Sequence, residues 1–124
     1  MTIILRPATS DDALGILERR NELSTRAMAI QTSPITHDEH LAWFQKRLSD
    51  PNSRIFIAEV PEIRVPEVGH IWLQRVGNSA GISVMVTEWE RGHGYGYEIV
   101  LNAIELCADW VDRFIAKIRI ENRV

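Results

Sequence analysis

The sequence predicts a single α+β domain in which a mixed, mostly antiparallel sheet is flanked by helices. Apolar residues recur at helical spacing in three segments, each of which begins with a capping or glycine signal. Between the second and third of these segments lie three stretches with strand-like alternation. With 45% hydrophobic and 25% charged residues, the 124-residue chain has the composition of one globular domain. The expected order across residues 1–124 is therefore β-α-α-β-β-β-α-β.

The N-terminal part is expected to form a strand and a helix. Thr2–Arg6 is rich in β-branched residues and is followed by Pro7, which stops a strand. A cluster of Thr, Ser and Asp then predicts a helix over Asp11–Arg20. Asn21–Pro34 has no firm period, so helix, loop and lid all stay open for it. The apolar stripe of the helix comprises Leu14, Ile16 and Leu17, and its polar side comprises Glu18, Arg19 and Arg20.

A second helix is predicted after Thr36, because Thr36 and Glu39 form a capping box. The first turn of this helix holds His37 and His40, a spacing that resembles a metal site. The pattern is not HExxH and no third ligand is evident, so we interpret it as a solvated helix start. The residues at helical spacing are Leu41, Phe44 and Leu48, and Asp50-Pro51-Asn52 ends the segment.

Three strands joined as an antiparallel meander are expected next. Arg54–Val60 alternates, with its isoleucines on one face and Phe56 and Ala58 on the other. The proline-containing stretch Pro61–Glu67 connects this strand to Val68–Val76. A turn at Gly77-Asn78-Ser79 then leads into Ala80–Val86.

A long helix over Tyr95–Asp112 and a last strand over Phe114–Ile120 complete the predicted fold. Cys107 is the only cysteine, which excludes an internal disulfide and a CxxC redox site and fits a reducing cytoplasm. We interpret Cys107 as a core residue. The apolar face of the helix comprises Ile99, Ala103, Leu106 or Cys107, and Trp110.

The charge and the first residues exclude several classes of protein. A formal net charge of −3 and a pI near 5.8 provide no basic field for nucleic acid, so any anionic ligand must be bound locally. The apolar run Met1–Leu5 is too short for a signal sequence or a membrane span. We therefore expect a soluble cytoplasmic protein without a membrane partner.

The strongest functional signal is the glycine-rich turn Arg91-Gly92-His93-Gly94-Tyr95-Gly96, which stands between a strand and a helix. Free backbone N–H groups and the helix dipole converge on such a turn and favour an anion. The dinucleotide pattern G-x-G-x-x-G fails because its third glycine position is Tyr97. A Walker loop fails because no lysine lies between Lys46 and Lys117.

What remains is R-x-x-G-x-G, with Arg91, Gly94 and Gly96 at the fixed positions. With its preceding strand and following helix, this motif resembles the GNAT superfamily of N-acetyltransferases. The resemblance implies acetyl-CoA as cosubstrate and no metal, with the pyrophosphate held by the loop and the pantetheine arm by the end of the strand. The implied cofactor-binding residues are Val84, Met85, Val86, Arg91, Gly92, His93, Gly94, Tyr95, Gly96 and Asn122.

Further upstream, Arg20-Asn21 and the stretch from Thr36 to Phe44 resemble one GNAT subgroup. Its members acetylate the 4-amino group of a UDP-linked trideoxy sugar in the pseudaminic acid pathway. The subgroup often has a tryptophan before the Arg-Asn pair, where this chain has Arg19. The resemblance implies a nucleotide sugar as acceptor. Arg20 and Asn21 are candidates to hold a phosphate or sugar hydroxyl of it, and a solvated helix end is the alternative. Trp43, beside the aperiodic stretch, is a candidate to line the substrate pocket, and core packing is the alternative.

Two side chains are candidates for the chemistry of acetyl transfer. Some family members use a glutamate of the fourth strand as base, but Ala80–Val86 offers only Ser83. His70 in the preceding strand has an ordinary pKa suited to passing a proton through water, and a purely hydrogen-bonded histidine is the alternative. Glu59 and Glu88 are weaker candidates. A backbone N–H within Val84–Val86 is expected to serve the oxyanion.

Relative to the family pattern, the chain stops before the final helix, with its tyrosine general acid, and the closing strands. We therefore expect an uncovered strand edge, so that either the chain is a shortened form of the domain or, as we predict, a homodimer covers the edge. Two alternative functions stay open beside acetylation of a small-molecule amine. One is a non-catalytic acyl-CoA-binding or assembly module, and the other is acetylation of a protein N-terminus or another small amine.

Overall fold

The computed structural model describes residues 2–22, 34–87 and 90–116. The N-terminal elements are β1 (Ile4–Pro7), a 3-10 turn (Ser10–Asp12), α1 (Ala13–Asn21) and α3 (His37–Ser49). They are followed by β2 (Ser53–Glu59), β3 (Glu67–Val76), β4 (Ser79–Val86), α4 (Tyr95–Leu106) and β5 (Arg113–Ala116). The predicted order of strands and helices is confirmed.

The five strands form one sheet in the order β1-β2-β3-β4-β5. Strands β1 to β4 pair antiparallel, whereas β5 runs parallel to β4. In the register, Ile57 of β2 lies opposite His70 of β3, and His70 lies opposite Met85 of β4. The prediction of a mixed, mostly antiparallel sheet is confirmed, and its central strands place the candidate site residues His70 and Met85 opposite each other.

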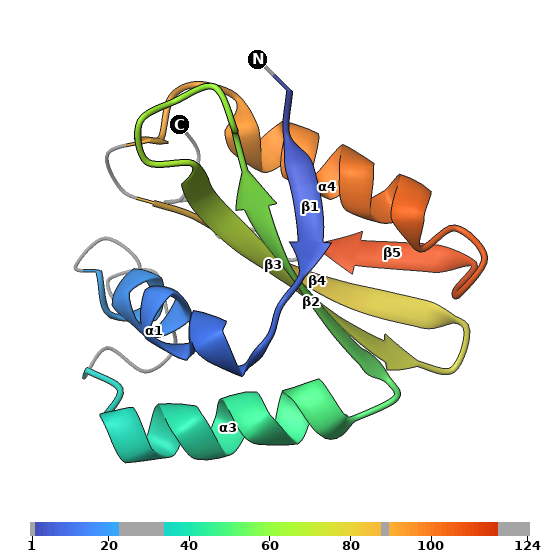
Figure 1. The fold of residues 1–124 in the computed structure, drawn as a ribbon. Helices are drawn as coiled ribbons and strands as arrows, with labels where there is room; N and C mark the ends of the chain where they lie inside the picture. Colours follow the sequence, from blue (N-terminus) through green and yellow to red (C-terminus); the bar gives the residue numbers. More distant parts are fainter. Residues whose placement is uncertain (1, 23–33, 88–89, 117–124) are drawn as a thin grey trace.

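The helices cover opposite faces of the sheet (Figure 1). Helices α1 and α3 lie on one face, where Ile16 and Phe44 pack against Ile55 and Ile57 of β2. Helix α4 lies on the other face, and its residues Ile99, Ala103 and Cys107 pack into a second buried cluster with Ile71 and Leu73 of β3. The predicted alternation of β2 between the two faces and the burial of Cys107 are confirmed.

Several predicted boundaries differ from the structure. Pro7 belongs to β1, which is possible because β1 is an edge strand and the missing N–H of proline breaks no ladder there. Helix α4 ends at Leu106 instead of Asp112. The chain turns there because it must return to the sheet: the N–H groups of Asp112 and Arg113 both donate to the carbonyl of Asn78 in the β3–β4 turn.

The orientation of α1 also differs from the sequence pattern. Leu14, expected in the apolar stripe, is 60% exposed, whereas Arg19, expected on the polar side, is only 5% exposed. Ile16 is fully buried, as predicted. The helix therefore turns Ile16 and Arg19 toward the sheet, and the cause of this orientation is the polar partner that Arg19 finds on β3.

Some expectations fall on residues outside the described part of the chain. These are most of the aperiodic stretch 21–34, Glu88, Asn122 and the end of the last strand beyond Ala116. No helix within residues 2–22, 34–87 and 90–116 is both long and apolar enough to cross a membrane.

Candidate functional site

The glycine loop leads into α4 with two glycines in the left-handed region of backbone conformation. Gly92 has a φ of 89° and Gly94 a φ of 77°, values that side-chain-bearing residues adopt at a cost. Gly94 is the N-cap residue of α4, and no side chain caps the helix. The ladder of the helix begins where Glu98 N–H donates to the Gly94 carbonyl. The N–H groups of the three preceding residues are therefore available to an anion.

The start of α4 is held close to the end of β4. A Cβ on Gly96 would lie 3.7 Å from Cγ2 of Val86, an ordinary packing distance. The exposed side chain of Arg91 donates from Nε to the Val86 carbonyl at 3.2 Å. His93 is exposed, with its ring centroid 5.3 Å from that of Tyr95. The structure thus places the loop residues next to the strand end that the sequence assigned to the pantetheine arm.

The backbone at the end of β4 is not paired with the described part of β5. The parallel pairing runs from Ser79 to Ile82 of β4, and no described residue pairs with Val84–Val86 on that side. On the other side, a Cβ on Gly69 would overlap the carbonyl oxygen of Met85. The absence of a side chain at position 69 therefore lets β3 approach this carbonyl closely.

His70 lies on the face of the sheet that α1 covers and is 3% exposed. Arg19 of α1 donates from Nε to Nδ1 of His70 at 2.7 Å and from Nη1 to Oε2 of Glu67 at 2.7 Å. Because arginine only donates, Nδ1 carries the lone pair and the hydrogen of the neutral ring sits on Nε2. Burial lowers the pKa of His70 well below its usual value, and the charge of Arg19 acts in the same direction.

A second arginine–histidine pair lies beside the first one. Nη1 of Arg20 lies 3.0 Å from Nδ1 of His40, and Nε2 of His40 lies 2.7 Å from the carbonyl oxygen of Ala13. The carbonyl requires a donor, so the hydrogen of His40 is on Nε2, and Nδ1 accepts from Arg20. Burial lowers the pKa of His40. The guanidinium carbon of Arg20 lies 4.2 Å from the ring centroid of Trp43, a cation–π distance.

The structure also places two other predicted residues, Asn21 and Ser83. The side-chain amide of Asn21 is paired with the backbone of Ile35, accepting its N–H at 2.7 Å and donating to its carbonyl at 2.9 Å. Asn21 therefore fastens the chain before α3 to the end of α1. Ser83 is half-buried and lies opposite Trp72, two residues from Met85 and on the same face of β4 as Met85.

The structure thus joins most of the predicted residues into two neighbouring groups. The glycine loop and the end of β4 form one, and Arg20, Trp43 and His70 lie in the other, between α1, α3 and the sheet. Glu22 connects them, since its Oε1 lies 3.9 Å from Nη2 of Arg91. The sequence did not predict four residues of these groups: Arg19, His40, Glu22 and Glu67. The one available signal was the pair of adjacent arginines, Arg19 and Arg20, at the end of a predicted helix.

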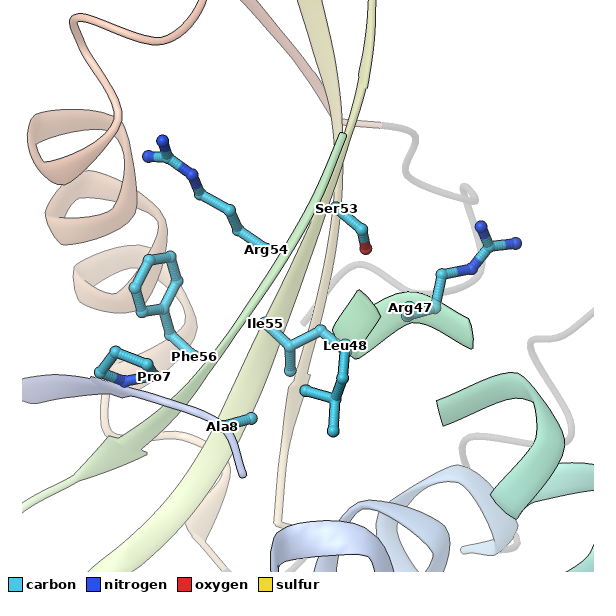
Figure 2. A pocket seen from close by; sticks show the side chains of 8 residues that line it. All are labelled: Pro7, Ala8, Arg47, Leu48, Ser53, Arg54, Ile55 and Phe56. Carbon is cyan, nitrogen blue, oxygen red and sulfur yellow. The ribbon is translucent and has the colours of Figure 1, made fainter. Parts of the chain in front are cut away.

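A separate hollow of about 370 Å³ lies at the β1–β2 edge (Figure 2). Two arginines border it: Arg47 has Nη1 3.7 Å from Oδ2 of Asp50, and Arg54 stacks on Trp110 at 4.2 Å. Figure 2 shows Ile55 between them. Because β2 is separated from β4 by β3, this hollow is not part of the glycine-loop site. No group of three potential metal ligands was found within the described residues.

A sheet, a positive-φ glycine loop and an uncapped helix start form an arrangement that favours an anionic ligand. The family model described as acetyltransferase (GNAT) domain matches residues 2–124, so the chain belongs to the GNAT acetyltransferases. Enzymes of this family use acetyl-CoA as cosubstrate, as the sequence motif indicated. A search of curated proteins found no match.

Solved structures share the fold at low sequence identity. Spermidine N-acetyltransferase from Vibrio cholerae, solved with CoA and spermine, has a TM-score of 0.82 at 17% identity, over 97% of this chain and 73% of that one. An N-acetyltransferase from Staphylococcus aureus Mu50 has a TM-score of 0.79 at 21% identity, over 99% and 77%. A Salmonella typhimurium protein solved with its cofactor acetyl-CoA has a TM-score of 0.77 at 18% identity, over 98% and 73%.

Proposed function

We propose that this chain transfers the acetyl group of acetyl-CoA to a primary amine of a small molecule. The observation that carries the proposal is the uncapped start of α4 behind Gly92 and Gly94, both at positive φ. The free N–H groups there suit the pyrophosphate, and the backbone of Val84–Val86 suits the pantetheine arm and the thioester. The solved neighbours named with CoA or acetyl-CoA support this assignment.

In the proposed reaction the amine nitrogen attacks the thioester carbonyl, the C–N bond forms, and the C–S bond then breaks to release the thiolate. A backbone N–H near Met85 stabilises the oxyanion. His70 and Ser83 stay the candidate side chains. With its hydrogen on Nε2, His70 holds, as a donor, the water that carries the amine proton to solvent, and the departing thiolate is protonated from solvent.

For the acceptor, we propose the amino group of a nucleotide-linked sugar, with Arg20 and Trp43 as contact residues. The proposal is supported by the guanidinium of Arg20 on the face of Trp43, which offers both charge and an aromatic surface. Asn21 contributes indirectly, because its amide is bound to the backbone of Ile35 and so holds the start of α3, which carries Trp43, against the end of α1.

The test is release of free coenzyme A thiol from acetyl-CoA in the presence of single amines, including a UDP-linked 4-amino sugar. Mass spectrometry then locates the acetyl group on the product. Amine-dependent thiol release with acetyl on nitrogen is the expected result. Binding of coenzyme A without release for any primary amine would leave only a binding module.

We also propose that two copies pair through the β5 side of the sheet. Within the described sheet β5 is one of the two edge strands, and Ile115 on it is 49% exposed. Light scattering at micromolar concentration tests this directly. A dimer mass is expected, and a monomer mass would count against the pairing.

A further inference from the structure

The two adjacent arginines of α1 use histidines as hydrogen-bond partners. Arg19 donates to Nδ1 of His70 at 2.7 Å, and Nη1 of Arg20 lies 3.0 Å from Nδ1 of His40. Both rings accept at Nδ1 and are therefore neutral. An imidazole in this state satisfies a donor but does not neutralise a guanidinium, so two positive charges stand beside two uncharged rings.

Among the described residues, a carboxylate pairs with only one of these two arginines. Glu67 pairs with Arg19 at 2.7 Å. No ion pair involves Arg20 among the described residues, and desolvation lowers the pKa of its half-buried guanidinium. Residues 23–33, which follow in the sequence, contain one arginine and neither Asp nor Glu. Removing a charge from water without a counter-ion is costly, so a ligand that supplies the missing negative charge is favoured at Arg20.

Arg19, the neighbour of Arg20 on α1, has a donor without an acceptor among the described residues. Nη2 of Arg19 is buried and has no hydrogen-bond partner in the described part of the chain, while the side chain as a whole is 6% exposed. Buried donors are satisfied in nearly all proteins, so an unsatisfied one next to a binding region requires an explanation. Together with the guanidinium of Arg20, it makes this side of the site rich in donors.

We infer that the acceptor amine carries an anionic group, a carboxylate or a phosphate, and that Arg20 on the face of Trp43 is its counter-ion. The inference rests on the proposed acetyl transfer and narrows its substrate class. A polyamine would place further positive charges against Arg19 and Arg20, where like charges repel. The site therefore selects anionic amines and discriminates against polycations.

The test uses matched acceptors that differ only in the anionic group. O-phosphoethanolamine is compared with ethanolamine, β-alanine with propylamine, and spermidine serves as the polycation. At least one anionic member is expected to exceed its uncharged partner in kcat/KM by about tenfold or more, the effect of one charge-assisted hydrogen bond. The better pair shows whether phosphate or carboxylate is preferred. Equal rates within both pairs, or preference for spermidine, would overturn the inference.

Two variants test whether Arg20 causes the preference for an anionic acceptor. Arg20→Gln is expected to abolish it while leaving the affinity for coenzyme A unchanged. Arg54→Gln removes an arginine of β2 that stacks on Trp110, away from Arg20 and Trp43, and is expected to keep the preference for the anionic acceptor. If Arg20→Gln lowered the rates with charged and uncharged amines equally, Arg20 would not be the counter-ion.

A binding measurement separates this inference from the proposed function. With coenzyme A at saturation to occupy the glycine loop, inorganic phosphate and β-alanine are compared with chloride at equal ionic strength in a thermal-shift assay. At least one of the two is expected to raise the Tm of the unsubstituted chain but not that of Arg20→Gln. No shift with either would overturn the anion site, whereas no shift with coenzyme A itself would overturn the proposed function.

Discussion

Nε of Arg19 donates to Nδ1 of His70 across 2.7 Å, joining the end of α1 to the third strand of the sheet. The same guanidinium bonds Glu67 three residues earlier on that strand. Both bonds lie on the side of the sheet that α1 and α3 cover, and His70 is opposite Met85 of β4 in the register. This contact fixes the rotation of α1 and the protonation of a buried imidazole at once.

Replacing Arg19 with methionine keeps much of the buried volume but removes all of its donors. Nδ1 of His70 and the carboxylate of Glu67 then lose their partner, and the free energy of unfolding should fall by about 1–3 kcal/mol. Urea unfolding measures the loss. The matched control is Arg64→Met at an exposed position, expected to change stability by less than about 0.5 kcal/mol. Equal midpoints for both variants would mean that the buried contact adds no stability.

The two buried histidines predict a pH dependence of stability. Because the folded-state pKa values of His40 and His70 are lowered, the unfolded chain binds protons below about pH 6.5 that the folded chain does not. Stability should therefore decrease as pH falls from about 6.5, by at most about 1.4 kcal/mol per pH unit for each histidine. Chemical unfolding at a series of pH values tests this.

The source of that pH dependence is assigned with variants. His70→Gln should flatten the slope, whereas His37→Gln, at an exposed position, should leave it unchanged. An identical slope in the His70 variant would show that this histidine titrates normally in the folded state.

Gly94→Ala tests the conformation of the glycine loop. A Cβ there meets no atom within 4 Å, so the penalty comes from the φ of 77° and should amount to about 1–2 kcal/mol. Relaxation of the strain would turn the N–H groups of α4 and weaken coenzyme A binding. Calorimetry measures the affinity. Gly81→Ala is the control, because its φ is not positive and its nearest neighbour is 4.0 Å away.

Gly69→Ala tests the close approach of β3 to β4. The new Cβ would overlap the Met85 carbonyl, so the strands must separate, with a loss of about 1–3 kcal/mol. Thermal unfolding against Gly81→Ala in the same hairpin isolates this effect. If the two alanine variants melted together, the strands would have room that the structure does not show.

The order of elements could be predicted because its signals are local. Thr36 caps the helix as predicted, with Glu39 N–H donating to the Thr36 hydroxyl, although this hydroxyl, and not the Thr36 backbone N–H, donates to Oε1 of Glu39. The loop motif also sufficed to name the family. The partners of Arg19 could not be predicted in this way, since they lie 48 and 51 residues further along the chain. A pattern of charged residues marks a surface unless a distant partner is known.

His40 is a second residue whose environment could not be predicted from the local sequence. Its position in the first turn of a capped helix predicted a solvated residue, yet it is fully buried. The reason is long-range, because α1 supplies both the Ala13 carbonyl and the guanidinium of Arg20. The proposed acceptor side of the site thus depends on the packing of two helices, whereas the proposed acetyl-CoA side depends on six consecutive residues.

Hydrogen exchange of the amides of Tyr95, Gly96 and Tyr97, measured by NMR with and without coenzyme A, tests binding at the glycine loop most directly. These N–H groups precede the first bond of the α4 ladder, so they should exchange rapidly in the free protein and slow when the pyrophosphate accepts from them. Slowing at these three positions is the predicted result. Saturation with coenzyme A without any change in their exchange would contradict the assignment of this loop.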